Sequence, residues 1–255
     1  MFKKLLAAAG VGGAEVETIV HTPGVQPGGT VHGTVRLRGG SVAQEISRVA
    51  VEFVTRVEFE HAEDEYDRAR GFYLTDVHGP VYLSPGASYE IPFELYTPLE
   101  APITFFHGRQ LPGMAVAVRT IVEIAGAVDP GDSDPIGIGA LPAQHVILSA
   151  IEELGFPLHS ADCEWGLLRG IPQELPFYQE IEFGRSHLYP NLKQLEVTFV
   201  AGAEGVHVVL EGDRKSGLLS AGGDLYNVVF VGHYDLDRVD WVAVFDERLR
   251  GMASR

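Results

Sequence analysis

The chain has 255 residues, of which 45% are hydrophobic, and a formal net charge of −16 at pH 7. This length suits one or two domains with buried cores. The acidic balance and the lack of a basic stripe exclude a typical nucleic-acid binder, and the net charge favours basic protein partners without identifying them. The single cysteine, Cys163, excludes an intrachain disulfide and favours the cytoplasm.

The first 13 residues predict a short amphipathic helix. Its apolar run ends at Gly10, which is short for a secretory signal, and no stretch of about 20 apolar residues predicts a membrane span. We expect any membrane contact to be peripheral, and self-association through this helix is a further possibility. The candidate interaction residues here are Phe2, Lys3, Lys4, Leu5 and Leu6.

Residues 14–128 are dominated by strands whose side chains alternate between apolar and polar. Turns rich in Pro and Gly separate these runs at intervals of about 8–12 residues, which is typical of an antiparallel sandwich. We therefore predict an N-terminal β-sandwich domain over residues 14–128. An acidic run within it predicts a solvated loop or hairpin tip that could recognise a basic partner, through Glu63, Asp64, Glu65 and Asp67.

Residues 129–135 are polar and rich in Asp, Pro and Gly, which predicts an interdomain linker. A second β-sandwich domain is expected over 136–255. It would contain a helix from Pro142 to Gly155 and a C-terminal helix over 235–250, capped by Asp235 or Asp237. Its predicted strands are Phe156–Trp165, Phe177–Phe183, Gln194–Ala201, Val206–Lys215 and Tyr226–Val231.

Motif searches reveal no catalytic constellation. The chain lacks a G-x-S-x-G elbow, and Cys163 lies between Asp162 and Glu164, which disfavour a reactive thiolate. The ten histidines lack zinc-site spacing, and the aspartates of 129–135 lack the terminal glutamate of an EF-hand loop. We therefore expect no catalysis, cofactor or metal, although scattered histidines could still converge in space.

Several segments, taken in chain order, resemble one bacterial family. They are residues 2–6, 10–18, 27–28, 33–35, 39–46, 154–156, 162–164, 175–183 and 195–199. Together they resemble the sporulation-control (SpoOM-type) family, whose members have an arrestin-like fold. The resemblance covers nearly the whole chain. It implies a mainly β protein of two tandem arrestin-like sandwich domains, without known catalytic residues, that regulates development or stress responses through protein partners.

Two functions remain open. The first is a non-enzymatic regulator or scaffold that binds partners through sheet edges and loops. The alternative is a carbohydrate-binding or hydrolytic enzyme on a β-sandwich scaffold. That enzyme would need an aromatic-lined cleft with converging carboxylates whose pKa values are strongly raised.

Overall fold

The computed structural model describes residues 13–61, 64–124, 131–213 and 226–254, with no side-chain description for residues 60, 61, 64–67 and 213. Its contacts divide the chain into two compact units. Unit 1 comprises Met1–Thr55, Ala69–Pro98 and Ala115–Gly137, and unit 2 comprises Arg56–Arg68, Leu99–Met114 and Ile138–Arg255. Each unit therefore draws on discontinuous stretches of sequence. Neither described helix is long and apolar enough to cross a bilayer.

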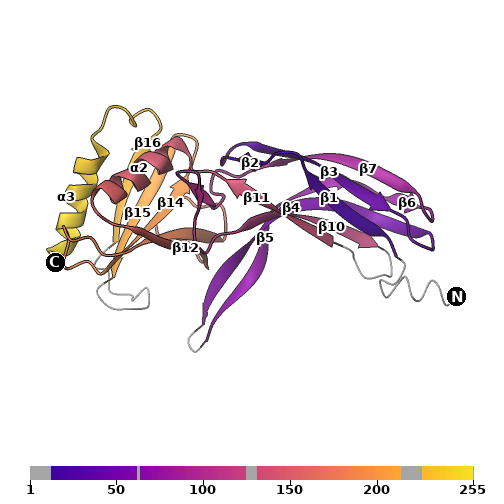
Figure 1. The fold of residues 1–255 in the computed structure, drawn as a ribbon, viewed down its shortest axis with the longest axis horizontal. Helices are drawn as coiled ribbons and strands as arrows, with labels where there is room; N and C mark the ends of the chain where they lie inside the picture. The colour runs from indigo at the N-terminus through magenta and orange to yellow at the C-terminus, as the bar shows by residue number, and fades with distance from the viewer. Residues whose placement is uncertain (1–12, 62–63, 125–130, 214–225, 255) are drawn as a thin grey trace. The chain divides into compact units, whose positions relative to one another are not determined.

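Unit 1 contains two sheets (Figure 1). The first has the order β1 (Glu15–Val20), β3 (Thr30–Arg38), β7 (Ser88–Tyr96). The second sheet is built around β4 (Gln44–His61), which pairs with β5 (Asp64–His78), β6 (Val81–Leu83) and β10 (Val116–Ile124). The end of β4 and the start of β5, over Arg56–Arg68, belong to unit 2. Strand β10 pairs in turn with β11 (Gly131–Ile138), and β2 (Gly24–Val25) follows β11 in the order.

The period-two pattern of the sequence explains how these two sheets pack. Val31, Val35 and Leu37 of β3 are buried, whereas Arg36 and Arg38 point to solvent. Polar contacts also join the sheets, since the hydroxyl oxygens of Thr18 on β1 and Thr120 on β10 lie 2.6 Å apart. The predicted packing of two sheets in this part of the chain follows from the alternation of buried apolar and exposed polar side chains within each strand.

The predicted linker over 129–135 is wrong where the structure describes it. Residues 131–135 belong to β11, which runs antiparallel to β10 with Ile121 opposite Gly131 and Val116 opposite Ile136. Only Ile136 and Ile138 of this strand are buried, so its first half is polar and its composition resembles that of a loop. Asp132 is fixed structurally, because its carboxylate accepts a hydrogen bond of 2.6 Å from the Thr18 amide.

Unit 2 contains an antiparallel sheet whose strands follow one another in chain order. They are β12 (Leu158–Trp165), β13 (Phe177–Phe183), β14 (Gln194–Ala201), β15 (Gly205–Asp213) and β16 (Tyr226–Gly232). All five predicted strands are confirmed, with small differences at their ends, and the last two residues of the predicted strand Val206–Lys215 lie outside the described residues. The last part of β4 pairs with β12 in parallel, and β8 (Phe105–Phe106) pairs with β9 (Arg109–Gln110).

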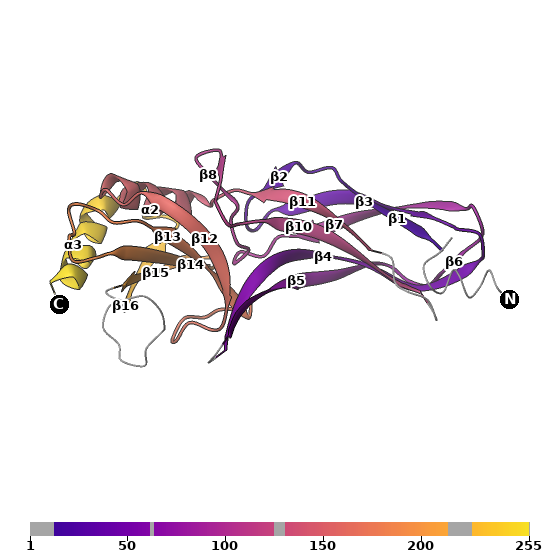
Figure 2. The same ribbon diagram turned by 60° about the horizontal axis from the view of Figure 1, so that its bottom comes forward.

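Two helices, α2 (Pro142–Glu153) and α3 (Trp241–Ala253), pack together beside these strands (Figures 1 and 2). The predicted helix starting at Pro142 is confirmed. The C-terminal helix starts later than predicted, because residues 235–239 form turns and Asp240 is the cap. With only two helices among many strands in the described residues, the predicted mainly β class is confirmed. The predicted N-terminal helix lies outside the described residues.

The cap of α3 leads to a direct test of where this helix begins. The Asp240 carboxylate accepts a hydrogen bond of 3.0 Å from the Ala243 amide. Asp240→Ala is expected to lower the free energy of unfolding by about 1 kcal/mol, because that amide loses its partner. Both tryptophans, Trp165 and Trp241, lie in unit 2, so their fluorescence in urea titrations reports on this unit.

The exposed Asp237 provides the matched control, since sequence alone made it a candidate cap. Asp237→Ala should change the free energy of unfolding by less than about 0.5 kcal/mol. A larger loss for Asp237→Ala than for Asp240→Ala would place the start of α3 elsewhere.

Candidate functional site

The sheet of unit 2 has two chemically different faces. One face is apolar and buried, with residues such as Ile181, Val197 and Leu210 fully inaccessible. The helices α2 and α3 also carry apolar stripes, which include the buried Ile147 and Phe245 and are suited to cover this apolar face of the sheet. The opposite face carries most of the acidic residues of β12 to β15, and it is our candidate site.

The pairing of the strands places these acidic residues in rows across the sheet, because directly paired residues point to the same side. One row comprises Ser160, Glu182, Glu196, Glu211 and Tyr226. The next comprises Asp162, Glu180, Thr198, Val209 and Val228. Beyond it, Glu164 pairs with Tyr178, and Val200, His207 and Phe230 pair in series.

These rows change from charged to apolar as they approach β16. We call the carboxylates of β12 to β15 the acidic face: Asp162, Glu164, Glu180, Glu182, Glu196 and Glu211. We call the exposed side chains of β16 the apolar edge: Tyr226, Val228 and Phe230. The two surfaces are continuous on one side of the sheet.

The carboxylates of the acidic face lie close together. Oxygens of Asp162, Glu164 and Glu180 lie within 4.8 Å of one another, as do oxygens of Glu180, Glu196 and Glu211. Glu180 therefore belongs to both groups and is the centre of the cluster.

Neighbouring polar groups hold several of these carboxylates in place. The Tyr178 hydroxyl donates to Glu164 at 3.2 Å, and the Gln194 amide donates to Glu196 at 3.2 Å. The Ser160 hydroxyl donates to Glu182.

Burial and mutual repulsion change the protonation of this cluster. Burial raises the pKa of Glu180 far above its ordinary value, and the charges of Glu164 and Glu196 raise it further. Burial, followed by the charge of Glu211, raises the pKa of Glu196 to about 7. Part of the acidic face is therefore protonated near neutral pH, and its charge increases as the pH rises.

Such a cluster can interact with several kinds of cation. Three carboxylates within this distance can provide oxygen ligands to Ca²⁺ or Mg²⁺. They can also accept hydrogen bonds from the ammonium or guanidinium groups of a partner, which are stronger than bonds between neutral groups. Either interaction would favour the ionised carboxylates and lower their pKa values.

The sequence contains a signal for this site. Asp162 and Glu164 flank Cys163, which is buried within β12, so the two acidic residues lie on the opposite side of the strand from it. The same alternation of acidic and apolar residues recurs in β13, where Ile181 separates Glu180 from Glu182. Acidic residues two positions apart on adjacent predicted strands could have indicated one charged face.

The structure tests none of the predicted interaction residues. Phe2, Lys3, Lys4, Leu5 and Leu6, together with Glu63, lie outside the described residues. Asp64, Glu65 and Asp67 belong to β5, but their side chains are also outside the description. These residues remain predicted interaction surfaces.

The histidines form no larger metal-binding group in the described parts of the chain. The rings of His107 and His145 have centroids 4.6 Å apart, and His107 Nε2 lies 3.4 Å from a carboxylate oxygen of Glu152. However, the described groups of three or more close metal-ligand atoms consist of carboxylates alone.

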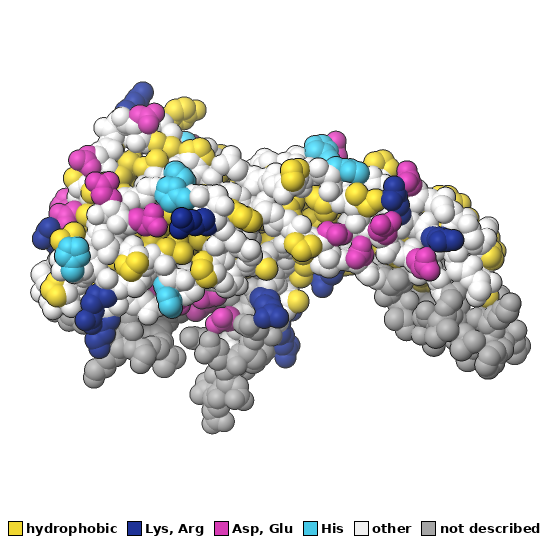
Figure 3. All heavy atoms as spheres, viewed as in Figure 1, with side chains coloured by type: hydrophobic (Ala, Val, Ile, Leu, Met, Phe, Trp, Pro, Cys, Tyr) yellow, Lys and Arg dark blue, Asp and Glu magenta, His cyan; other side chains and the backbone are white. Residues whose placement is uncertain are grey.

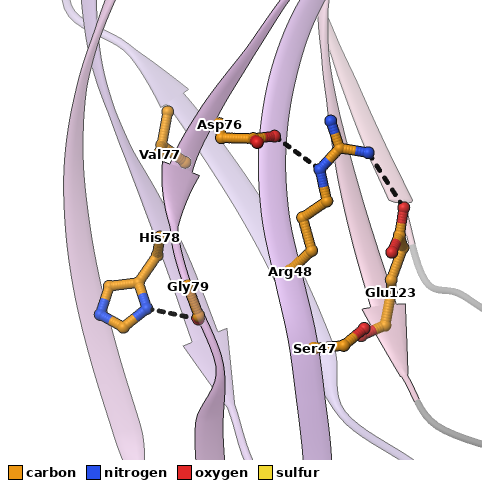
Figure 4. Close-up of a pocket in the computed structure, with 7 residues that line it drawn as sticks. All are labelled: Ser47, Arg48, Asp76, Val77, His78, Gly79 and Glu123. Carbon is orange, nitrogen blue, oxygen red and sulfur yellow. Dashed lines mark hydrogen bonds and ion pairs between the residues drawn. The ribbon is translucent and has the colours of Figure 1, made fainter.

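Two hollows are lined by residues other than those of the acidic face. The one in unit 1 has a volume of about 500 Å³ and surrounds Arg48 (Figure 4). Arg48 donates to Asp76 at 2.5 Å and to Glu123 at 3.1 Å, so an anionic ligand would compete with two carboxylates.

The other hollow, of about 330 Å³, is a groove between α2 and α3 lined by apolar residues such as Val146 and Trp241. Figure 3 shows hydrophobic side chains exposed among charged ones on the side of unit 2 that carries these helices.

Comparison with known proteins identifies the family. Residues 2–216 match the family described as SpoOM protein. The sporulation-control protein spo0M of Bacillus subtilis (strain 168) is 36% identical over 229 residues, which are 89% of this chain and 86% of that protein. The chain belongs to the SpoOM family. A crystal structure of Spo0M from Bacillus subtilis matches with a TM-score of 0.82 and 30% identity, covering 95% of this chain and all of that one. The predicted family and the mainly β fold are thus confirmed.

Proposed function

We propose that this SpoOM-family protein takes part in sporulation control as a non-enzymatic regulator or scaffold that binds other proteins in the cytoplasm. The relative from Bacillus subtilis, which bears the name sporulation-control protein, supports the biological role. The observation that carries the binding role is the continuous surface formed by the acidic face and the apolar edge.

This surface has the composition expected of a protein-binding site. Exposed aromatic and aliphatic side chains provide area that a partner can bury, and neighbouring charges select among partners. The net charge of −16 favours a basic partner at longer range. Self-association through residues 1–13 remains a prediction.

Complementation tests the proposed role. In a Bacillus subtilis strain that lacks its spo0M, expression of this chain is expected to restore the number of heat-resistant spores toward that of the parent strain. The matched control is the empty expression vector. Immunoblotting confirms expression, and a spore count that stays at the level of the empty vector despite expression would contradict the sporulation role.

One observation favours the alternative of a carbohydrate-active enzyme. The carboxylates converge and two of them have raised pKa values, as the general acid of a glycosidase requires. However, neither hollow described above includes a residue of the acidic face, and glycosidases bind sugars in clefts. Release of nitrophenol from a panel of nitrophenyl glycosides, abolished by Glu180→Gln, would favour this alternative over the binding role.

A further inference from the structure

We propose that the outer edge of β16 binds a partner protein by adding an extended segment to the sheet, and that this segment alternates basic and apolar side chains. This inference rests on the proposed function and specifies the surface and the chemistry of the partner. Three independent features of β16 support it: its position, its exposed side chains and the charges beside it.

Among the strands that the structure describes, β16 is the end strand of the unit 2 sheet. It pairs with β15 over seven residues without a register shift, and no other described strand lies along its outer side. The outward backbone N–H and C=O groups of such a strand can pair with another chain. Main-chain hydrogen bonding to a sheet edge is a common mode of peptide recognition.

The sequence of β16 lacks the features that normally prevent pairing at an edge. Proteins protect edge strands with charged residues, proline or bulges. Strand β7, at the edge of the first sheet of unit 1, has such protection in Glu90, Pro92 and Glu94. Strand β16 reads Tyr-Asn-Val-Val-Phe-Val-Gly and contains neither a charged residue nor a proline. Its open edge is therefore suited to accept another strand.

The side chains of the apolar edge provide area for a partner to bury. Tyr226, Val228 and Phe230 are 39%, 41% and 51% exposed. They occupy alternate positions, so all three point to the side of the sheet that carries the acidic face. The aliphatic part of a lysine or arginine side chain on an added strand can cover such residues while its charged end remains outside.

The charges beside the apolar edge favour a basic segment. Tyr226 pairs with Glu211, and the same row continues to Glu196 and Glu182. A residue added opposite Tyr226 would lie two strand spacings, about 10 Å, from Glu211, which long basic side chains can span. The Tyr226 ring also attracts a cation.

The other side of an added strand would meet different surroundings. There it would extend the apolar row that contains Val229 and Val231, both of which are buried. A strand that alternates basic and apolar residues therefore satisfies both sides of the sheet. A second copy of this chain is disfavoured, because antiparallel pairing of two β16 strands would bring two acidic faces together.

Fluorescence anisotropy with the full-length protein tests this inference. The probes are two labelled peptides of about ten residues with blocked ends, one alternating Lys with Val and the other alternating Glu with Val. We expect the Lys–Val peptide to bind, with an affinity that falls as salt concentration rises, and the Glu–Val peptide not to bind. Val228→Lys should weaken that binding at least about tenfold, which corresponds to about 1.4 kcal/mol.

Two matched variants serve as controls. Val228→Thr keeps a neutral β-branched residue and should retain binding within about threefold. Tyr89→Lys introduces the same charge at an exposed position of β7 and should leave binding unchanged. Phe230→Lys provides a second edge variant if Val228→Lys shows a lowered urea midpoint.

Several outcomes would overturn the inference. These are equal binding of both peptides, no binding of the Lys–Val peptide, full binding by both edge variants, or a dimer in solution that Val228→Lys converts to monomers. The spore count separates this inference from the proposed function. If Val228→Lys complements as well as the wild-type chain, the edge is not the docking surface although the sporulation role stands. If the wild-type chain fails to complement, the sporulation role itself is contradicted.

Discussion

At pH 8, Glu180→Gln is expected to raise the free energy of unfolding by about 2 kcal/mol, whereas below pH about 4.5 the substitution should have little effect. Glu180 is mostly buried and lies within 4.8 Å of carboxylates on the neighbouring strands. Its ionisation in the folded protein therefore costs desolvation and repulsion, and both raise its pKa. Glutamine preserves the shape of the side chain and removes the charge.

The direction of the pH dependence follows from the same raised pKa values. The folded protein binds protons at Glu180 and Glu196 more tightly than the unfolded chain, in which glutamate has a pKa of about 4.5. The contribution of these protonated carboxyl groups to the free energy of unfolding is thus fully present below pH 4.5 and declines as the pH rises. The contribution of Glu196 is lost completely once the pH passes about 7, whereas that of Glu180 continues to decline at higher pH.

Urea titrations between pH 4 and pH 8.5, followed by tryptophan fluorescence, measure this effect in unit 2. Glu204→Gln is the control, because Glu204 is exposed in the turn between β14 and β15. It should change the free energy of unfolding by less than about 0.5 kcal/mol at any pH. A loss of stability in Glu180→Gln at pH 8 would show that a cation or a partner compensates the ionised carboxylate, and would contradict the prediction.

Phe245→Ala is expected to lower the free energy of unfolding by about 3–5 kcal/mol. Phe245 is fully buried in α3, and its ring centroid lies 6.4 Å from that of Trp241. Alanine would leave a cavity between α3 and its surroundings. Because domains are typically stable by only about 5–15 kcal/mol, this loss should destabilise the attachment of the whole helix.

The same fluorescence titration measures the effect of Phe245→Ala, and Trp241 reports on α3 directly. Arg248→Ala, at an exposed position of the same helix, is the matched control and should have an effect below about 0.5 kcal/mol. A loss below 1 kcal/mol for Phe245→Ala would mean that α3 does not pack through this residue.

The strands could be predicted from the sequence wherever their pattern was locally complete. Phe177–Phe183 and Gln194–Ala201 have the predicted limits, because each is a short run in which buried apolar residues dominate and acidic residues occupy less buried positions. Strand β11 was missed because its polar composition is typical of a linker. It is a strand because its backbone pairs with that of β10. The start of α3 was also misplaced, since several aspartates could serve as its cap.

The candidate site could not be predicted in the same way, because it depends on register. Glu180 meets Glu196 and Glu211 only through the pairing of β13, β14 and β15. These residues are far apart in sequence, and a register shift of one residue would move them to the opposite face. Their raised pKa values also depend on burial, which no sequence pattern specifies.

The unprotected edge of β16 has a consequence for the amount of protein that a cell can safely contain. A strand with an apolar side and an open backbone can template the pairing of other chains when no strand covers it. Repulsion between copies with a net charge of −16 opposes such clustering, but salt weakens that repulsion. On the inference that β16 binds a partner strand, synthesis of this protein should be matched to that of the partner, because excess copies would expose the edge.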